Sequence, residues 1–474
     1  MVWLWVYILS GWVIGMVALP VLARRCAPAK AWGWLAMMFA LPWLGLGLYL
    51  LLGENPLGRK RVVLYREVLR TKWGSGVVQR LAGYAAGGSL HQAARGIERL
   101  AQAGGALPAV GGNAGTLLAD HGRIVEQLVA DIDRAAHSVH MTFYIFRDDR
   151  TGRQVADALR RAAGRGVACR VLADAVGSHP MLLALAPELR AGGVDVRAAL
   201  PINPLRKRLS RIDLRNHRKI AAIDGRVGYI GSWNVADPDY GRGRATHYLD
   251  LLMRLEGPIV WQVQLLFLED WRFETEQSLQ DEDAFPPPQQ AGDGIMQAVP
   301  SGPMYPSVPV RDLTVSAIHL AERRVVMTTP YLVPDEALML ALCLAAGRGV
   351  RVDVIVPERS DNPFVDAAGR SYIRELVAHG VAVHLYPNHV LHSKTLTVDH
   401  MLGMIGSANF DIRSFCLDVE ANLLIYSPPL VNALLALQDR YVGQSRPVGQ
   451  EELGKAGRLR QFGQDVARLL SPLI

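Results

Sequence analysis

HRKIAAIDGRVGYIGSWN, residues His217–Asn234, recurs later in the chain as HSKTLTVDHMLGMIGSAN, residues His392–Asn409. In each copy a Lys follows the His by two residues, an Asp follows the Lys by five, and Gly-Ser-x-Asn closes the stretch. One such pattern is weak evidence, but two copies in the same eighteen-residue frame are not a coincidence of common residues. The shared positions are His217, Lys219, Asp224, Ser232 and Asn234 in the first copy, and His392, Lys394, Asp399, Ser407 and Asn409 in the second.

Strands and helices alternate around each copy. The strands expected before the first copy are 139–146, 167–174 and 194–200, and the helices 124–136, 152–163 and 181–191. The strands expected before the second copy are 325–331, 350–357 and 381–386, with helices at 336–346 and 372–378. This order predicts an α/β fold of two duplicated halves, each with a mixed, largely parallel sheet flanked by helices.

A repeated turn and a Pro-rich segment support this division. The hexapeptide AAGRGV occurs at Ala162–Val167 and Ala345–Val350, each time with Gly where a helix stops and a strand begins. DEDAFPPPQQAGDG, Asp281–Gly294, predicts a surface linker. The expected parts are a membrane segment 1–74, a connector 75–115, a first half 116–280, the linker 281–294 and a second half 295–474.

Two further helices are expected. Pro258–Thr275 is apolar on one face and is predicted to pack in the core. The C-terminal segment 451–474 predicts an amphipathic helix, which either docks onto the body or lies at a membrane surface.

Two apolar runs near the N-terminus, Val2–Ala23 and Ala31–Gly53, are each long enough to cross the ~30 Å hydrocarbon core as a helix. They predict a transmembrane hairpin; the alternative for the first run is a cleaved signal peptide, but no basic residues precede it. Three basic residues lie between the runs and six follow the second, a count that favours a cytoplasmic body.

Charge and composition exclude several classes of function. Residues 1–74 hold nine Lys or Arg and two acids, so this segment accounts for the whole net charge of +7 and the body is neutral. A neutral body argues against nucleic acid as a partner. The four Cys are widely spaced, and no HExxH, Walker or EF-hand pattern occurs, so the sequence implies neither a metal nor a cofactor.

Paired His and Lys suit the chemistry of a phosphodiester. One imidazole, neutral, can attack phosphorus and form a phosphoryl-His, while the other, protonated, donates to the leaving oxygen and later deprotonates the incoming hydroxyl. On an extended chain each Lys points to the same face as its His and can hold the phosphate oxygens. The two Asn can add amide donors, whereas the two Ser suit the turn. Asp224 and Asp399 stand at strand ends, where Asp favours a turn over direct catalysis.

The doubled frame resembles the signature of the phospholipase D superfamily. RNHRKIAAIDG (Arg215–Gly225), PSGP (Pro300–Pro303) and TTPYLVPD (Thr328–Asp335) resemble its bacterial cardiolipin synthases, and the resemblance covers nearly the whole chain. It implies a multi-pass protein of the bacterial inner membrane that transfers a phosphatidyl group between two phosphatidylglycerol molecules, giving cardiolipin and glycerol. A hydrolase, a transferase using another donor such as phosphatidylethanolamine, and an inactive membrane scaffold remain alternatives. The sequence is silent on the oligomeric state.

The resemblance also implies roles for single residues. His217 is expected to be the nucleophile and His392 the acid and base, although the two copies are too alike for the sequence itself to distinguish them. An acid that follows each His within its own half is expected to orient that His. These acids are Asp250 for His217 and Glu420 for His392.

Basic residues crowd just before the first copy. They predict either a solvated loop or a wall facing lipid headgroups at the mouth of the site. These residues are Arg206, Lys207, Arg208, Arg211, Arg215 and Arg218. Eight other His that lack the frame are expected to be structural or exposed, namely His121, His137, His140, His179, His247, His384, His389 and His400.

Overall fold

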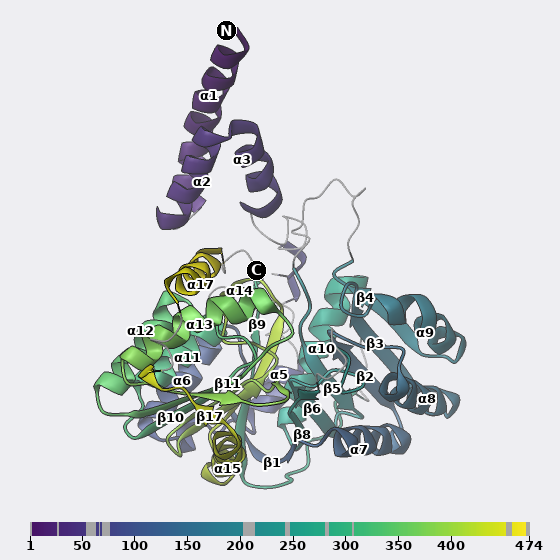
Figure 1. Cartoon of the computed structure of the whole chain (residues 1–474). Helices are drawn as coiled ribbons and strands as arrows, with labels where there is room; N and C mark the ends of the chain where they lie inside the picture. Colours follow the sequence, from purple (N-terminus) through teal and green to yellow (C-terminus); the bar gives the residue numbers. More distant parts are fainter. Residues whose placement is uncertain are drawn as a thin grey trace. The chain divides into compact units, whose positions relative to one another are not determined.

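The computed structural model describes residues 2–25, 28–53, 63–65, 67–68, 76–201, 214–241, 247–279, 284–305, 308–451 and 457–470 (Figure 1). The chain divides into one unit of residues 1–62 and 203–214 and a second unit of residues 63–202 and 215–474. Both copies of the repeated frame therefore belong to the same unit.

The first unit contains the apolar helices. The run at the N-terminus forms one helix, α1 (Val2–Arg25), and within the described residues α1 alone is long and apolar enough to cross a membrane. The second run is instead divided into α2 (Pro28–Ala40), α3 (Pro42–Leu48) and a π-helical turn, η1 (Tyr49–Gly53). The break falls at Leu41, whose φ of −134° and ψ of 76° are not helical, because a residue before Pro avoids the α conformation.

A fifteen-stranded sheet organises the second unit, in the order β17-β12-β11-β10-β14-β15-β16-β9-β1-β8-β6-β5-β2-β3-β4. The strands towards the first-copy edge are β1 (Val110–Leu118), β2 (Ser138–Phe143), β3 (Ala168–Asp174), β4 (Asp195–Ala199), β5 (Lys219–Ile223), β6 (Val227–Gly231) and β8 (Leu252–Glu256). The others are β9 (Gly294–Ser301), β10 (Arg324–Thr328), β11 (Arg351–Pro357), β12 (Ala382–Tyr386), β14 (Thr395–Val398), β15 (Leu402–Gly406), β16 (Glu420–Ile425) and β17 (Arg446–Pro447). Two short strands, β7 (Tyr248–Leu249) and β13 (Val390–Leu391), pair separately.

The sheet is mixed, but the prediction that it is largely parallel is wrong. Parallel pairing is confined to β2-β3-β4 and β10-β11-β12 in this sheet, and the other pairings are antiparallel. The difference arises because each repeated frame folds as an antiparallel hairpin, β5-β6 or β14-β15, whose second strand pairs with β8 or β16. A tight turn can join antiparallel strands, whereas parallel neighbours need a crossover.

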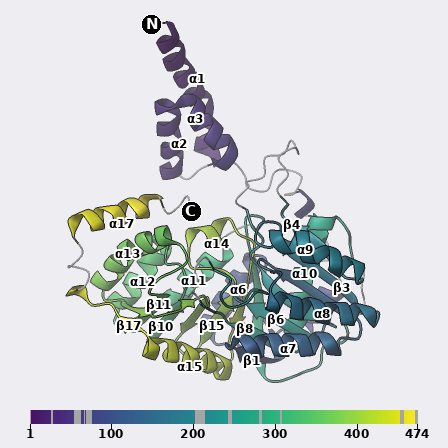
Figure 2. The ribbon, with the colours of Figure 1, turned by 45° about the vertical axis from the view of Figure 1, so that its right-hand side comes forward.

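Helices cover the sheet. In both views α7 (His121–Arg134), α8 (Arg150–Gly164) and α9 (His179–Ala191) lie beside β2, β3 and β4 (Figures 1 and 2). The second half carries α11 (Pro309–His319), α12 (Glu336–Gly347), α13 (Pro363–Ala378), α14 (Ile412–Cys416), α15 (Pro428–Gln444) and α17 (Arg458–Leu470). Both AAGRGV turns adopt the expected form, since Gly166 and Gly349 have φ of 88° and 86° after the ends of α8 and α12.

The predicted core helix is confirmed. It forms α10 (Ile259–Thr275), which is buried along most of its length and packs against β5, β6 and β9. Trp261 and Trp271 are 0% and 1% exposed, and both belong to a core cluster that includes strands of both halves.

Two expected boundaries differ from the structure. The connector holds α5 (Gly76–Ala82), η2 (Gly87–Ser89) and α6 (Gln92–Ala103), but its end at residue 115 falls inside β1, which joins β9 to β8 in the sheet. The linker is not wholly on the surface, because Ala284 and Phe285 are buried and the ring of Phe285 packs edge-on against Trp261. Apolar side chains before the Pro run therefore dock that segment onto α10.

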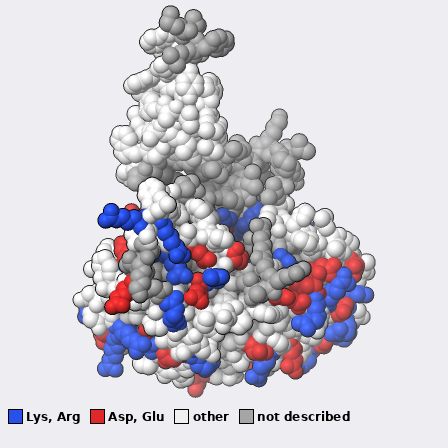
Figure 3. Space-filling view, in the orientation of Figure 1, with Lys and Arg blue, Asp and Glu red and all other residues white. Residues whose placement is uncertain are grey.

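Charges of both signs are interspersed over the second unit on the face shown in Figure 3. Lys and Arg alternate there with Asp and Glu, in keeping with the neutral composition of the body.

Candidate active site

Each repeated His stands directly before a hairpin strand that carries its Lys. Lys219 begins β5, and Lys394 immediately precedes β14. The amino group of Lys219 donates to the backbone oxygen of His217 at 2.7 Å, and that of Lys394 to the backbone oxygen of His392 at 2.6 Å. Both Lys are buried. The extended backbone thus places each amino group on the same side as its imidazole.

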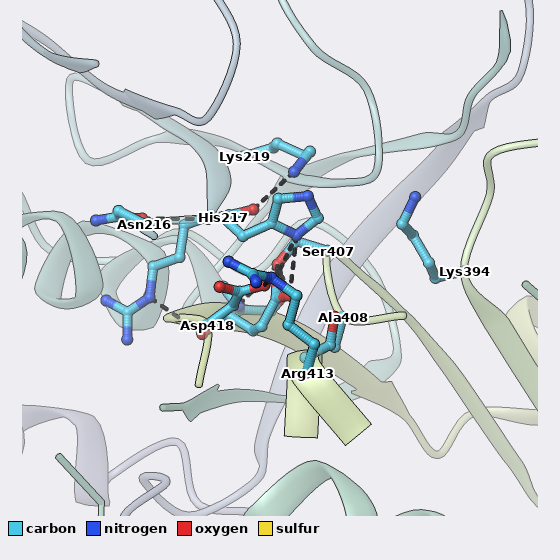
Figure 4. Close-up of polar contacts among 12 residues, drawn as sticks. Asn216, His217, Lys219, Lys394, Ser407, Ala408, Arg413 and Asp418 are labelled. Atoms are coloured by element: carbon cyan, nitrogen blue, oxygen red, sulfur yellow. Dashed lines mark hydrogen bonds and ion pairs between the residues drawn. The ribbon is translucent and has the colours of Figure 1, made fainter. Parts of the chain in front are cut away.

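Both imidazoles line one cavity of about 320 Å³, together with Asn234 and Asn409. Figure 4 shows the His217 ring with Lys219 on one side and Lys394, from the other copy, facing it across the site. The two copies of the frame therefore converge on one space.

The acids that contact the imidazoles are crossed between the halves, so the expected pairing within each half is wrong. Nδ1 of His217 lies 2.9 Å from Oε1 of Glu420, and Nδ1 of His392 lies 2.7 Å from Oδ1 of Asp250. Glu420 is fully buried and Asp250 is 7% exposed. A carboxylate on Nδ1 fixes the orientation of a ring and leaves Nε2 for chemistry.

Backbone contacts across the halves explain the crossing. The amide of His217 donates to the oxygen of Val419, the residue before Glu420, at 2.8 Å. In the same way the amide of His392 donates to the oxygen of Leu249, the residue before Asp250, at 2.8 Å. The parallel pairing of β7 with β13 holds the second of these contacts. Each acid therefore lies beside the His of the other half.

The two Ser of the repeated frames hold the acids. Ser232 Oγ donates to Asp250 at 2.7 Å, and Ser407 Oγ donates to Glu420 at 2.5 Å. Each Ser thus fixes the acid of its own half, which in turn contacts the imidazole of the other half. Both hydroxyls are engaged with a carboxylate, which agrees with a local bonding role for Ser.

The two Asn differ in their surroundings. The amide nitrogen of Asn234 donates to the hydroxyl of Tyr240 at 3.0 Å. Asn409 lines the same cavity, and its side-chain oxygen is buried without a hydrogen-bond partner among the described residues. A buried amide left open in this way is available to a bound molecule.

Asp224 and Asp399 are not beside the imidazoles, although both were included in the catalytic motif. Asp224 follows β5, at the opposite end from Lys219, which separates them by about 16 Å of extended strand. Its carboxylate accepts the backbone amides of residues 136, 137 and 138, and that of Asp399 accepts those of residues 322, 323 and 324. The two residues have φ of 52° and 50°. They form turns that tie the hairpin to the sheet, as their strand-end position indicated.

Burial and mutual charge set the protonation of the cationic groups. Burial lowers the pKa of His217 well below its ordinary value, and Lys219 and Lys394 lower that pKa further. Burial also lowers the pKa of Lys219 to about 8 and that of Lys394 to about 7. A bound phosphate would favour the charged form of both amino groups.

The two acids have opposite pKa shifts. Burial raises the pKa of Glu420 to about 7, against the opposing charge of Lys219. Burial also acts to raise the pKa of Asp250, but His392, Lys394 and the hydrogen bond from Ser232 together outweigh it, and the pKa falls below its ordinary value. Burial and Lys394 hold the pKa of His392 below its ordinary value, although Asp250 acts to raise it.

The Arg–Asp pairs near His217 were not predicted from the sequence, because Arg215 was named without its partner and neither Arg413 nor Asp418 was named. Arg413 Nε lies 3.2 Å from Asp418 Oδ2, and Arg215 Nη1 lies 3.3 Å from Asp174 Oδ1. Arg215, Arg413 and Asp418 line the cavity, and Figure 4 shows Arg413 and Asp418 near His217. Burial raises the pKa of Asp418 well above its ordinary value despite Arg413. The only sequence signal for this pair was its place between Asn409 and Glu420.

The basic cluster before the first copy separates into different environments. Residues 206–211 lie outside the described residues. Arg215 lines the cavity, which agrees with a wall at the site. Arg218 is 1% exposed and instead donates to Asp270 at 2.7 Å and to the hydroxyl of Tyr305 at 2.9 Å, so it belongs to the core.

Tyrosine rings flank both imidazoles. The Tyr144 ring meets that of His217 edge-on at a centroid distance of 4.7 Å, and the Tyr248 ring meets that of His392 at 5.3 Å. The hydroxyl of Tyr331, within TTPYLVPD, donates to Asp361 at 2.7 Å inside the same cavity. The site thus has a wall of Tyr and Asp361 as well as a wall of charged pairs.

Within the described residues no three His, Cys, Asp or Glu side chains are grouped so that they could hold a metal ion. The polar side chains that line the cavity carry imidazole, guanidinium, phenol, amide and carboxyl groups.

Known proteins resemble the chain over its whole length. The family model described as "Cardiolipin synthase, PLD-like domain" matches residues 128–271 and 314–440. The chain is 34% identical to proteins named Cardiolipin synthase A from Erwinia tasmaniensis and Pectobacterium atrosepticum, with 99% of this chain and 98% of each relative covered. The crystal structure of phosphatidylserine synthase from Haemophilus influenzae matches with a TM-score of 0.61 at 14% identity, covering 80% of this chain and all of that one, and shows the fold. The chain belongs to the cardiolipin synthase family with phospholipase D-like domains.

Proposed function

We propose that this protein is a phosphatidyltransferase that joins two phosphatidylglycerol molecules into cardiolipin and releases glycerol. The observation that carries the proposal is the convergence of His217 and His392, each with a Lys beside it, on one cavity. The family of the chain supplies the choice of substrate. The proposal assigns His217 as nucleophile and His392 as acid and base.

The first half-reaction transfers the phosphatidyl group to the protein. Nε2 of His217 attacks phosphorus, and the bond from phosphorus to the glycerol headgroup breaks as the new P–N bond forms. His392 gives its proton to the departing glycerol oxygen. Lys219 and Lys394 offset the charge on the nonbridging oxygens.

The second half-reaction restores both imidazoles. His392, now neutral, takes the proton from the terminal hydroxyl of a second phosphatidylglycerol, whose oxygen attacks phosphorus as the P–N bond breaks. The pKa of both imidazoles lies below its ordinary value, but that of His217 is lowered further, which suits the neutral nucleophile, whereas Asp250 acts to raise the pKa of His392 and so favours a proton there. These two environments support the assignment of roles that the sequence alone left symmetric.

The test is the product mixture. Purified full-length protein is incubated with phosphatidylglycerol in detergent micelles, and cardiolipin, glycerol and phosphatidic acid are measured by mass spectrometry. His217→Ala and His392→Ala should each lower the rate of cardiolipin formation by about 10³-fold or more. His319→Ala, an exposed His at the end of α11, is the matched control and should retain wild-type activity.

The same assay distinguishes the alternatives. Phosphatidic acid in place of cardiolipin would identify a hydrolase, and ethanolamine released from mixed lipids would identify phosphatidylethanolamine as donor. An equal lipid profile for wild type and both His variants would mean that the protein is the inactive membrane scaffold. Trapping the phosphoryl-His and mapping it to position 392 would reverse the roles of the two imidazoles.

We also infer that the two motif-bearing segments, 116–280 and 295–474, arose by duplication, and that segment 2–53 enters the bacterial inner membrane as a hairpin with the body in the cytoplasm. Support for the duplication comes from the repeated frame, the repeated AAGRGV turn and the matching order of β2-β3-β4 and β10-β11-β12. Support for the orientation comes from the six basic residues after the second run. Reporter fusions after residue 75 test the orientation: periplasmic activity there would overturn it.

A further inference from the structure

Helix α17 docks onto the body through its polar face. It packs along α13, which lies beside it in Figures 1 and 2. Ser371 Oγ donates to Asp465 at 2.8 Å, and Arg468 pairs with Glu375 at 2.7 Å. Arg374 adds contacts to Gln464 and Asp465. Several polar contacts therefore fix which face of α17 meets the protein.

The opposite face of α17 carries an apolar stripe, formed by Leu459, Phe462, Val466 and Leu469. Their spacing of three, four and three residues places them along one side of a helix. They are 85%, 66%, 37% and 78% exposed, respectively. A helix on a water-soluble body usually turns its apolar side inwards, so this arrangement is reversed and leaves the apolar stripe outermost.

Helix α17 is held by a segment of α13 that adjoins the catalytic cavity. Phe364, Val365 and Ala368, in the first turns of α13, line the cavity. The residues of α13 that hold α17 begin at Ser371, one turn after Ala368, and end at Glu375. At a rise of 1.5 Å per residue, the cavity-lining residues of α13 and the residues that hold α17 are separated by about 5–16 Å along α13. One rigid helix thus connects the two.

Charge next to the apolar stripe favours an anionic surface. Arg458 and Arg460 are exposed in the first turn of α17, on either side of Leu459. A helix that combines an apolar stripe with adjacent Arg lies readily in the interface of a bilayer that contains anionic lipid.

We propose that the apolar stripe of α17 lies in the interface of an anionic lipid bilayer and thereby holds the mouth of the catalytic cavity against the membrane. The choice of a lipid surface as occupant rests on the proposed function, because a substrate with two acyl chains must pass between bilayer and cavity. The bilayer engages the second unit directly, in addition to any anchoring by α1.

The primary experiment measures depth and needs no enzymatic activity. Phe462→Cys is spin-labelled in full-length protein whose four native Cys are replaced by Ala, and the protein is placed in nanodiscs of phosphatidylglycerol and phosphatidylcholine. The label should be reached by oxygen, which concentrates in the bilayer, and shielded from a water-soluble nickel complex. Leu340→Cys on α12, another exposed apolar position at 58% exposure, is the control and should show the aqueous pattern. An aqueous pattern at 462 would overturn the proposal, as would strong spin–spin broadening from a second copy of the chain.

A kinetic experiment separates this proposal from the proposed function. Replacing Leu459, Phe462 and Leu469 by Ser should lower the rate on phosphatidylglycerol vesicles by about tenfold or more, because three apolar side chains no longer enter the interface. The rate on short-chain, water-soluble phosphatidylglycerol should stay at the wild-type value. Equal rates on vesicles would overturn the docking role alone, whereas inactivity of the wild type on both substrates would overturn the proposed function alone.

Discussion

The two copies of the His-Lys-Asp frame match in geometry and differ in electrostatics. In both, the Lys donates to the backbone of its His, the Ser holds an acid, and the Asp binds three backbone amides. Yet His217 faces Glu420, whose pKa is raised to about 7, whereas His392 faces Asp250, whose pKa is lowered. Arg413 and Asp418 lie on the side of His217 (Figure 4).

This contrast teaches that residues inside the frame set positions and residues outside it set protonation. The repeated residues give two equivalent imidazoles. Their division into nucleophile and acid requires surroundings that differ, because two rings with the same pKa cannot be neutral and charged in different proportions. Here the difference comes from the crossed acids and from Arg413 and Asp418 beside His217.

The crossed acids should produce the largest effect of the variants aimed at this contrast. Glu420→Gln and Asp250→Asn should each lower the transfer rate by about 10²-fold or more, because each leaves an imidazole without its orienting carboxylate. Asp250→Asn should also lower the pKa of His392 and leave that of His217 nearly unchanged. The measurement is the pH dependence of acylation of each His by diethyl pyrocarbonate, followed peptide by peptide. If Asp250→Asn altered His217 instead, the pairing across the halves would be wrong.

Glu420→Gln should shift the midpoint of His217 by less than Asp250→Asn shifts that of His392. The reason is that Glu420, with a pKa of about 7, is partly protonated at neutral pH and contributes less negative charge. Equal shifts would remove the electrostatic difference between the copies. Leu340→Ser, an exposed change on α12 and outside the cavity, is the control for general effects of substitution.

Each of the two Lys should contribute its own step to the pH dependence of anion binding. Lys394 loses its proton near pH 7 and Lys219 near pH 8, so affinity for a tetrahedral oxyanion such as vanadate should fall as pH rises through this window. Loss of one positive charge next to the anion should cost about tenfold in affinity. Lys394→Gln should abolish the step near pH 7 and keep the step near pH 8. The inhibition constant measured between pH 6 and 9 checks this, and a flat profile for the wild type would contradict it.

Asp224→Ala and Asp399→Ala should have the smallest effect on rate and a clear effect on stability. Each removes a carboxylate that accepts three backbone amides, at a cost of about 1–2 kcal/mol in the free energy of unfolding. The rate per folded molecule should change by less than about threefold, since neither residue is at the cavity. Thermal melting in detergent together with the rate of the folded fraction checks both statements.

Asn at either position is the conservative control. It tolerates the left-handed backbone that both residues adopt and keeps one acceptor oxygen, so Asp224→Asn should recover part of the lost melting temperature. A loss of rate at full stability would instead place Asp224 or Asp399 in the chemistry.

The repeated frame was the part of the site that sequence could predict best. Fixed spacing within a hairpin determines where Lys219 lies relative to His217, and a strand-end Asp before Gly indicates a turn. The crossing of Glu420 and Asp250 could not be predicted in this way, because it depends on backbone pairing between segments that are far apart in the chain. Spacing along the chain identifies the acids but not their partners.

In the fold, too, features set by neighbouring residues could be predicted, whereas features set by contacts between distant segments could not. The parallel strands, α10 and the AAGRGV turns follow from local pattern, whereas the place of β1 between β9 and β8 depends on the whole sheet. The break at Leu41 did have a local signal, because Pro42 follows it. This signal was overlooked because the apolar run as a whole is long enough to span a membrane. For Arg413 and Asp418 the only signal was their place in the chain between Asn409 and Glu420.

The exchange of acids between the halves also constrains how such a chain can arise or be divided. A shorter chain with a single frame would carry an imidazole and an acid that cannot reach one another. It could complete its chemistry only by pairing with a twin through a twofold axis, each member lending its carboxylate to the other. Fusion into one polypeptide removes that dependence on concentration and frees each borrowed carboxylate to change on its own.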